Sequence, residues 1–375
     1  MGQHSEVFVG IDTSKLKNAV AVAEAGRDGA VRYLGEFDTT EAATAKWIAR
    51  LAARHGTLTL CYEAGPTGYG LQRQIEGLGH RCLVIAPSLI PKRAGDHVKT
   101  NRRDAEGLAR NLRAGELTAV WVPDAAHEAM RELSRARGSA VDDLKSKRQE
   151  ISSLLLRYGL HYPGTKTWGR AHRTWIAQTK LPHPQQRFVL EELHGAERQI
   201  QERIDRIESE IRAGLPDWSL RDVVGALCAL RGIDTTSAVT LMAEIGDLTR
   251  FARARELMGY LGLVPSEAST GERVRRGGIT KAGNRRARTS LVEAAWSYRH
   301  PPRIGAAKKA KVEAAPEAAR AIAWKAQVRL GQRYKALGRR GKKSVVAVTA
   351  IARELAGFVW AIGQEVRPIV AAGAR

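Results

Sequence analysis

The stretch EVFVGIDTSKLKNAVAVAE, residues 6–24, holds two runs rich in Val and Ala on either side of a short polar segment. A third run, VRYLGEFDT, follows the glycine-containing turn GRDG at residues 26–29. Runs of β-branched and small apolar residues bounded by turn signals are typical of strands. Residues 6–39 therefore predict a β-meander.

Helix-like and strand-like segments alternate after the meander. Residues 41–56 place apolar side chains at helical spacing and stop at Gly56. LTLCYEA (58–64) and RCLVIAP (81–87) are predicted strands, with a helix between them. This order predicts an N-terminal α/β domain with a mixed sheet, over residues 1–124.

Residues 125–216 change character and are predicted to be a helical linker. The isoleucines of a coiled-coil seam recur with spacings of four, three and four, at Ile200, Ile204, Ile207 and Ile211. A helix near residues 133–156 is the candidate antiparallel partner. The seam fits a helical hairpin within one chain or a dimer of two chains equally well.

The connection between those helices, residues 161–184, is basic and rich in Trp and His. It could stack bases or contact a phosphate backbone. Alternatively, Trp168 and Trp175 could anchor the loop to the core, and the pattern does not choose between these interpretations.

Residues 217–375 predict a third domain that is mainly helical. Near its start, in ALRGIDTTSAVTLMAEIGDL (229–248), Gly232 separates two helical runs in the manner of a helix-hairpin-helix. Such hairpins can present backbone N–H groups to a phosphate. Basic helices follow, and the last predicted helix is amphipathic.

The composition favours a polyanionic partner. Lys and Arg number 61 against 39 Asp and Glu, which gives a formal net charge of +22 and a pI of 10.3. This excess attracts phosphates over a Debye length of about 8–10 Å at moderate salt. DNA or RNA is the expected partner class, against the alternative of a soluble protein with a merely cationic surface.

The cysteines and the apolar segments exclude several classes of protein. Three cysteines stand far apart without metal-ligand spacing, so neither a zinc finger nor a disulfide framework is expected. The start lacks a long apolar segment, which argues against a secretion signal. No stretch approaches about 20 uncharged apolar residues, so no membrane span is expected and a cytoplasmic location is predicted.

Three acids stand where a nuclease would place metal ligands. Asp12 and Glu63 each end an apolar strand, and Asp104 opens a helix within the basic stretch VKTNRRDAEGLARNL, residues 98–112. Carboxylates that converge from separate elements hold one or two Mg²⁺ ions at such sites. Asp on a first strand, Glu on a central strand and Asp on a later helix is an order found in RNase H-like folds, although strand-end acids are often only solvated caps.

Long motifs carry a resemblance to a known family. They are GIDTSK (10–15), YEAGPTGYGLQRQIEGLGH (62–80), VIAPSLIPKRAGDHVKTNRRDAEGLARNLRAGELTAVWVP (84–123), GYLGLVPSEASTGERVRRGGITKAGNRRARTSLVEAAWSYR (259–299) and AVTAIARELAGFVWAI (347–362). Over nearly its whole length the chain resembles the IS110 insertion-sequence family of DEDD transposases. The resemblance implies a RuvC-like nuclease domain, a coiled-coil linker and a C-terminal transposase domain with a catalytic serine. It also implies recognition of donor and target DNA through a non-coding bridge RNA.

The resemblance assigns the first, second and fourth positions of the metal-binding tetrad to Asp12, Glu63 and Asp104. The third position falls on Asn101, whose amide oxygen can coordinate Mg²⁺ but adds no charge. Asp96 is a possible substitute. A Mg²⁺ cofactor is implied, and the number of ions stays open.

The second candidate for chemistry is PSEASTGERVRRGGITKAGNRRAR, residues 265–288. A hydroxyl that attacks a DNA phosphodiester needs nearby cations and a flexible glycine. The family's nucleophile commonly stands directly before that glycine, which is the position of Thr270. Ser269 is favoured because serine is the less hindered alcohol, and the alternative is that both hydroxyls only contact phosphate. The predicted nucleic-acid contacts are Lys99, Arg102, Arg103, Arg273, Arg275, Arg276, Lys281, Arg285, Arg286 and Arg288.

Three functions remain in competition. The leading one is an RNA-guided DNA recombinase that excises and integrates its own element, as a homodimer or homotetramer. The second is a metal-dependent junction endonuclease that uses water as its nucleophile. The third is a non-enzymatic basic nucleic-acid-binding protein whose acids are structural.

Overall fold

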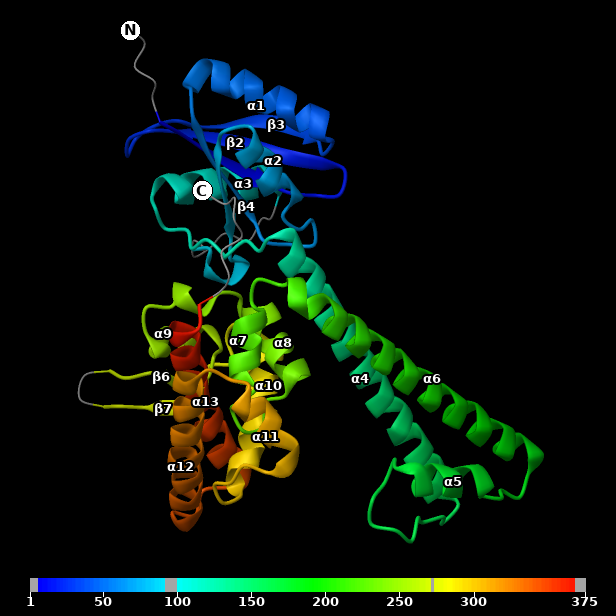
Figure 1. Cartoon of the computed structure of the whole chain (residues 1–375). Coiled ribbons are helices and arrows are strands. Elements are labelled where there is room, and N and C mark those ends of the chain that lie inside the picture. Colours follow the sequence, from blue (N-terminus) through cyan, green and yellow to red (C-terminus); the bar gives the residue numbers. More distant parts are fainter. Residues whose placement is uncertain (1–5, 92–99, 271–272, 368–375) are drawn as a thin grey trace. The chain divides into compact units, whose positions relative to one another are not determined.

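The computed structural model describes residues 6–91, 100–270 and 273–367. The chain divides into two compact units, Met1–Val122 and Pro123–Arg375 (Figure 1). The predicted boundary at residue 124 lies close to this division. The further boundary predicted at residue 216 stays a prediction.

A five-stranded sheet forms the centre of the first unit, with strand order β3-β2-β1-β4-β5. Its strands are β1 (Val7–Asp12), β2 (Lys17–Glu24), β3 (Val31–Asp38), β4 (Leu58–Glu63) and β5 (Arg81–Ile85). The first three strands pair antiparallel, as the predicted meander requires, whereas β4 and β5 run parallel to β1. The prediction of a mixed, RNase H-like sheet is therefore confirmed.

Helices cover both faces of this sheet. They are α1 (Glu41–His55), α2 (Gly70–Gly77) and α3 (Asn101–Arg113), with the 3-10 turn η1 (Pro87–Leu89) before α3. Alternate side chains of β1, such as Val9 and Ile11, pack against Trp47 of α1 and Ile75 of α2. Phe8 points to the opposite face and packs against α3. Because successive side chains of a strand point to opposite faces, α1 and α2 cover one face of the sheet. Among the helices described, α3 alone covers the other face.

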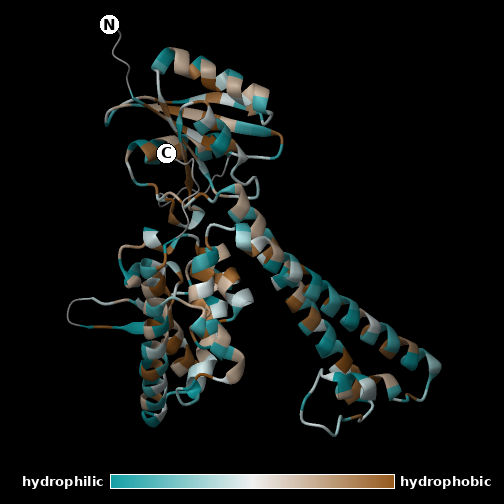
Figure 2. Ribbon diagram, in the orientation of Figure 1, coloured by the Kyte–Doolittle hydropathy of each residue, from teal (hydrophilic) through white to brown (hydrophobic). Residues whose placement is uncertain are grey.

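The second unit begins with an antiparallel helical hairpin. Its helices are α4 (Ala125–Arg157), α5 (Arg170–Gln178) and α6 (Pro184–Gly214). Ile207 near the end of α6 and Leu133 near the start of α4 pack against the same apolar cluster, and Leu190 near the start of α6 shares another cluster with Leu154. The predicted partner helix is confirmed, and the seam is filled within one chain. Figure 2 shows hydrophilic and hydrophobic residues alternating along both helices.

The aromatic loop at the far end of the hairpin is anchored rather than open. Trp168 and Trp175 pack, half-buried, against the apolar cluster between α4 and α6. His172 is buried and stacks on Trp175 with ring centroids 5.9 Å apart. Its Nδ1 accepts a hydrogen bond from the Trp168 backbone N–H at 2.9 Å. Of the two interpretations of this loop, the structure supports anchoring to the core.

The remainder of the second unit packs around its last helix. Its elements are η2 (Leu215–Asp217), α7 (Arg221–Leu227), α8 (Thr235–Ile245), η3 (Leu248–Arg250), α9 (Ala254–Tyr260), β6 (Pro265–Glu267), β7 (Arg276–Ile279), α10 (Arg285–Ala295), η4 (Trp296–Arg299), α11 (Ala306–Glu313), α12 (Glu317–Arg339) and α13 (Ser344–Glu365). Residues Ile351, Leu355, Val359 and Ile362 of α13 are fully buried in the core. The prediction of a mainly helical C-terminal region is confirmed.

The sequence predicts no membrane span. By length and composition alone, the 22-residue helix α13 passes a test for such a span, with 44% of its apolar window buried in the structure. A core helix meets the same criterion, because burial on several sides also demands apolar residues. Its contacts with α9, α10 and α12 make the core explanation sufficient.

The turn between α7 and α8 is where the sequence predicts a helix-hairpin-helix, which stays a prediction. Gly232 has φ +80°, and a Cβ there would lie 2.4 Å from the Ala294 carbonyl oxygen. The α8 N-terminus, however, is capped by its own Asp234, whose carboxylate accepts from the Ser237 N–H at 2.8 Å. Since this acid already occupies the helix end, a phosphate there would meet a negative charge.

Candidate active site

The ends of two neighbouring strands bring the first two predicted acids together. Strands β1 and β4 are parallel, and Ile11 lies opposite Tyr62 in their register. The next residues are Asp12 and Glu63, so both acids stand at the same level of the same sheet edge. Side chains at equal levels of parallel strands point to the same face. Both are half-buried.

The loops that follow these strands also meet at this edge. The Thr67 hydroxyl donates to the Thr13 hydroxyl at 3.4 Å. The Tyr62 hydroxyl donates to the Gly68 carbonyl at 2.9 Å, which holds the loop after β4 back against its own strand. The edge that carries the acids is therefore bordered by two loops in contact.

Helix α3 lies directly on β1 because residue 10 is a glycine. A Cβ at Gly10 would stand 2.3 Å from the Ala105 carbonyl oxygen and 2.4 Å from the Ala109 nitrogen. No side chain could fit at that separation, so backbone packs on backbone. The small residues Ala105 and Ala109 on α3 complete this close approach. This role of Gly10 was not predicted from the sequence, although the small residues Ala105 and Ala109 could have indicated such a close approach.

The direction of α3 brings its first turn to the acidic edge. At its C-terminal end, the Arg113 guanidinium donates to the carbonyl oxygens of Glu24 at 3.2 Å and Gly29 at 2.6 Å. Glu24 pairs with the first residue of β1. The helix thus runs antiparallel to β1, and its N-terminal turn with Asp104 lies toward the strand end that carries Asp12.

A cation and a phenol border the same edge. Arg102 donates from Nε to Glu106 at 2.8 Å, and its guanidinium lies over the Tyr33 ring, 5.5 Å from the centroid. Loss of hydration and the negative charges of Glu36 and Asp12 raise the pKa of Tyr33, against the opposing effect of Arg102. Asp12 is therefore within electrostatic range of the start of α3.

The donor set at this edge consists of oxygens, which suits a hard cation such as Mg²⁺. Asp12, Glu63 and Asp104 supply carboxylates, and exposed Asn101 supplies an amide. Among residues 6–91, 100–270 and 273–367, however, no three His, Cys, Asp or Glu side chains are gathered closely enough to hold a metal ion. The backbone therefore brings the donors to one edge without closing them into a metal site. The possible substitute Asp96 lies outside the described residues.

The predicted nucleophile lies in the second unit, on the hairpin formed by β6 and β7. Exposed Ser269 donates from its hydroxyl to Glu267 Oε1 at 2.9 Å. Arg276 Nε donates to the other carboxylate oxygen at 3.3 Å. Thr270 exchanges backbone hydrogen bonds with Arg273, both at 3.2 Å, just before the tip. The two hydrogen bonds hold the pKa of Glu267 below its usual value, that from Ser269 most strongly.

Glu267 is a functional candidate that the sequence analysis missed. It stands two residues before Ser269, and residues two apart on an extended chain share a face. That spacing was visible in SEAST, but an acid in a strongly basic loop has several ordinary explanations. Only the hairpin geometry distinguishes a hydrogen-bonded pair from a solvated acid.

The predicted cations differ in how far they are available to a phosphate. The exposed ones are Arg102 and Arg103 on α3, and Arg273, Arg275, Arg276, Lys281, Arg285 and Arg286 around the hairpin and the start of α10. Arg288 is half-buried and donates to the carbonyl oxygens of Leu261 at 2.8 Å and Ala282 at 3.0 Å. Burial lowers its pKa. Arg288 thus braces the loop before α10, and Lys99 lies outside the described residues.

A buried acid fixes the start of α10. Glu244 accepts two hydrogen bonds from Arg135 of α4, at 2.8 and 2.9 Å. It also accepts from Asn284, the N-cap of α10, at 2.7 Å. Burial alone would raise the pKa of Glu244, but the bonds from Arg135 and Asn284 outweigh it and lower the pKa. This network sets the position of Arg286. Its guanidinium packs against Gly138 of α4, where a Cβ would lie 2.3 Å from the Arg286 Nη1 atom.

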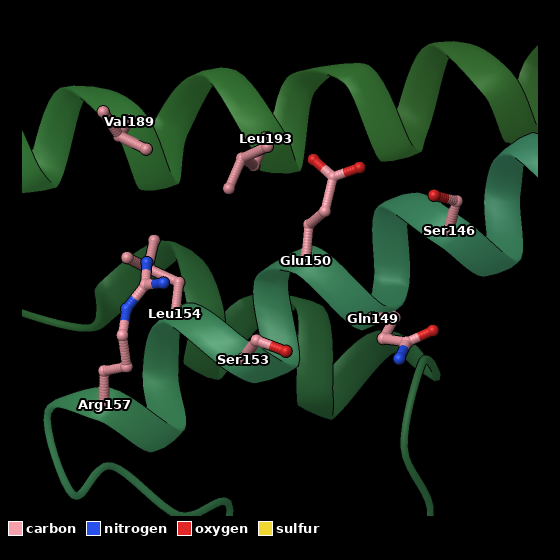
Figure 3. A pocket seen from close by; sticks show the side chains of 8 residues that line it. All are labelled: Ser146, Gln149, Glu150, Ser153, Leu154, Arg157, Val189 and Leu193. Carbon is pink, nitrogen blue, oxygen red and sulfur yellow. The ribbon is translucent and has the colours of Figure 1, made fainter.

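An open groove elsewhere in this unit does not have the features of an active site. It has a volume of 510 Å³ and lies between α4 and α6 (Figure 3). Its lining residues are Ser146, Gln149, Glu150, Ser153, Leu154, Arg157, Val189 and Leu193. None of the predicted catalytic residues is among them.

Comparison with known proteins covers both units. Residues 225–308 match the family described as Transposase IS116/IS110/IS902 family, and residues 9–160 match an IS110-type DEDD family described as Transposase. The protein named "Putative transposase y4qE" of Sinorhizobium fredii (strain NBRC 101917 / NGR234) is 54% identical over 367 residues, which cover 98% of this chain and 91% of that protein. The "Transposase for insertion sequence element IS1533" of Leptospira borgpetersenii is 28% identical over 348 residues, with coverage of 90% and 98%.

Proposed function

Because the chain belongs to the IS110/IS116/IS902 family of insertion-sequence transposases, we propose that it excises and integrates its own element by cutting and rejoining DNA strands. The observation that supports this most directly is the hydrogen bond from Ser269 to Glu267 on an exposed hairpin. A hydroxyl held by a carboxylate and flanked by cations has the parts that nucleophilic phosphoryl transfer requires.

The reaction proposed for this hairpin conserves the energy of the phosphodiester. The Ser269 oxygen attacks phosphorus, a bond from phosphorus to a deoxyribose oxygen breaks, and a phosphoserine link forms. The serine proton passes to Glu267 and then to the departing oxygen. Attack by a second strand's hydroxyl reverses these steps and restores Ser269. The exposed Arg273 and Arg275 would stabilise the additional negative charge on the phosphate.

The acidic edge of the first unit is proposed to hold the divalent ion that DEDD transposases generally use. Asp12 and Glu63 would bind it from the sheet, and Asp104 and Asn101 from α3. Bound there, the ion would neutralise charge on the scissile strand. The shared sheet edge and the oxygen donor set support this proposal, and the side chains must move together to bind the ion.

We further propose that a bridge RNA encoded by the element selects the DNA, and that two or four copies of the chain act together. These proposals follow from the family resemblance and from the net charge of +22. A structured non-coding segment in the DNA flanking the gene, with loops complementary to the element ends and the target, is the expected finding. The absence of any such segment would count against RNA guidance.

Trapping a covalent adduct tests the nucleophile. The parent, incubated with labelled DNA carrying an element end and with RNA transcribed from the flanking region, should yield a protein–DNA species that survives denaturation. Ser269→Ala should abolish it. Ser266→Ala is the matched control, because Ser266 lies on the same hairpin and donates to the Gly278 carbonyl at 3.1 Å. If Thr270→Ala alone removes the adduct, Thr270 is the nucleophile, and if the Ser269/Thr270 double variant still forms it, neither is.

The metal-dependent junction endonuclease is the second candidate, which the shared edge of Asp12 and Glu63 favours. Here water attacks the phosphorus and no covalent intermediate forms. In that case Asp12→Asn should abolish cleavage of a four-way junction, whereas Ser269→Ala should leave the rate nearly unchanged.

A further inference from the structure

Helix α12 has one side in the core and one side exposed to solvent. Its buried residues are Ala319, Ala323, Ala326, Gln327, Leu330 and Gly331. The side chains that lie outside this buried side are largely exposed. This exposed side carries basic side chains and a tryptophan that belong neither to the β6–β7 hairpin nor to the acidic edge.

The exposed side of α12 is strongly cationic. We define the α12 face as Arg320, Trp324, Lys325, Lys335 and Arg339, which project within an arc of roughly 140° at 100° per residue. The only acid in the helix is Glu317, at its first residue. Lys335 and Arg339 stand four residues apart, a spacing at which like charges repel each other. A bound polyanion would offset the repulsion between these two cations, because it attracts both.

Partners within the chain do not neutralise this face. Two further arginines of the helix, Arg329 and Arg333, bind Glu354 of α13 at 3.0 and 3.3 Å. No ion pair within 4.0 Å is found for the cations of the α12 face across the described parts of the chain. Lys325, Lys335 and Arg339 have no acid three or four residues away on the helix, the spacing at which Glu stabilises Lys and Arg.

Trp324 gives the face a second, independent feature. Its side chain is 47% exposed, although its chain neighbour Ala323 is buried in the core. A planar aromatic ring among cations is the arrangement by which proteins bind single-stranded nucleic acid, because bases stack on the ring while phosphates contact the cations. A duplex keeps its bases stacked internally and would leave the ring unused.

We propose that the α12 face binds a single-stranded segment of nucleic acid, with a base on Trp324 and the backbone along Arg320, Lys335 and Arg339. From Arg320 to Arg339 the face extends roughly 28 Å at 1.5 Å per residue. At the ~3.4 Å rise of a fully stacked strand, that length holds at most about eight nucleotides, and a more extended single strand would place fewer along it. The surface is distinct from the β6–β7 hairpin, and the inference does not depend on which hydroxyl is the nucleophile.

The cations are tested by salt-dependent binding of fluorescent 12-nucleotide strands, one of DNA and one of RNA, to the full chain. The Arg320→Gln/Lys335→Gln/Arg339→Gln variant should lower the slope of log affinity against log salt by about 2, since each lost contact to a single strand removes ~0.7. The matched control is Arg198→Gln/Arg203→Gln/Arg206→Gln on the acid-rich helix α6. It removes the same charge from an exposed surface and should leave the slope nearly as in the parent.

The ring is tested separately. Trp324→Ala should weaken single-strand binding about 5- to 100-fold, as loss of one stacked base does, and leave duplex binding within about twofold. Trp324→Phe should restore part of the affinity. Phe188→Ala removes an aromatic side chain of α6 that is 62% exposed, more than Trp324, and should change neither.

The results that would overturn the proposal are specific. Equal loss of slope in the α12 and α6 variants would mean that only net charge matters. Equal weakening of duplex and single-strand binding by Trp324→Ala would exclude stacking. Displacement of the strand by polyglutamate at equal charge would indicate an acidic protein partner instead. By contrast, tighter binding of either the DNA or the RNA strand by the parent, lost in the α12 variant, would support the proposal. It would also identify which nucleic acid the α12 face binds.

Discussion

Gly10→Ala should uncouple the acidic edge from the start of α3. The added methyl would stand 2.3 Å from the Ala105 carbonyl oxygen and 2.4 Å from the Ala109 nitrogen, whereas ordinary contact begins near 3.4 Å. Helix and strand must therefore separate by about 1 Å, at an overpacking cost of about 1–3 kcal/mol. Because Asp12 is on the strand and Asp104 is on the helix, their spacing changes by a similar amount.

A displacement of that size is expected to reduce DNA cleavage by about 10²-fold, as misplacing catalytic groups by 1 Å does. The rate would be measured on duplex carrying an element end, with Mg²⁺ and the flanking RNA present, at a temperature well below unfolding. Gly107→Ala is the matched control on the same helix, because a Cβ at Gly107 meets no atom within 4 Å. It should keep the cleavage rate and raise stability by up to about 1 kcal/mol.

An unchanged cleavage rate in Gly10→Ala would refute the reasoning, since the helix would then tolerate separation from β1. Equal loss in both variants would also refute it, because the effect would be a general property of α3. Circular dichroism and thermal unfolding verify that each variant is folded at the assay temperature.

Three further predictions follow from single contacts. Glu267→Gln, which keeps the shape but accepts no proton, should slow adduct formation about 10²-fold, while Glu267→Asp recovers part of the rate in the same gel assay. Glu244→Ala should lower the free energy of unfolding in urea by about 1.5–3 kcal/mol, because the charged hydrogen bonds from Arg135 are lost. His127 is buried and its pKa falls to about 4, so the folded state binds fewer protons than the unfolded state. Stability should therefore drop as the pH falls from 6.5 toward 4, and His127→Gln should flatten that part of the profile; an equal drop in the variant would contradict this.

Local patterns were sufficient for much of the fold. The two runs rich in Val and Ala in residues 6–24 and the turn at 26–29 correspond to an antiparallel meander, and the isoleucine seam of α6 packs against the predicted partner helix α4. These features depend on residues near each other in sequence, whose periodicity reports the face they bury. The parallel pairing of β1 and β4, which places Asp12 and Glu63 at one edge, was not specified by these local patterns.

Composition alone did not decide the setting of α13 or of the aromatic loop. A long apolar helix suits a membrane or a core, and packing against α9, α10 and α12 supports the core. Trp168 and Trp175 could equally have stacked on bases, and their contacts with the α4–α6 cluster decided otherwise.

By itself, the sequence determined the order of strands and helices, the positive charge, and the acids and hydroxyls available for chemistry. Tertiary structure alone decided that Gly10 seats α3 on β1, that Glu267 holds Ser269, and that Glu244 joins Arg135 to Asn284. The physical reason is that a hydrogen bond or a close contact is made or lost when the distance between two side chains changes by a few tenths of an ångström. Residue identity and spacing determine which side chains can meet, and packing of the whole chain determines which do.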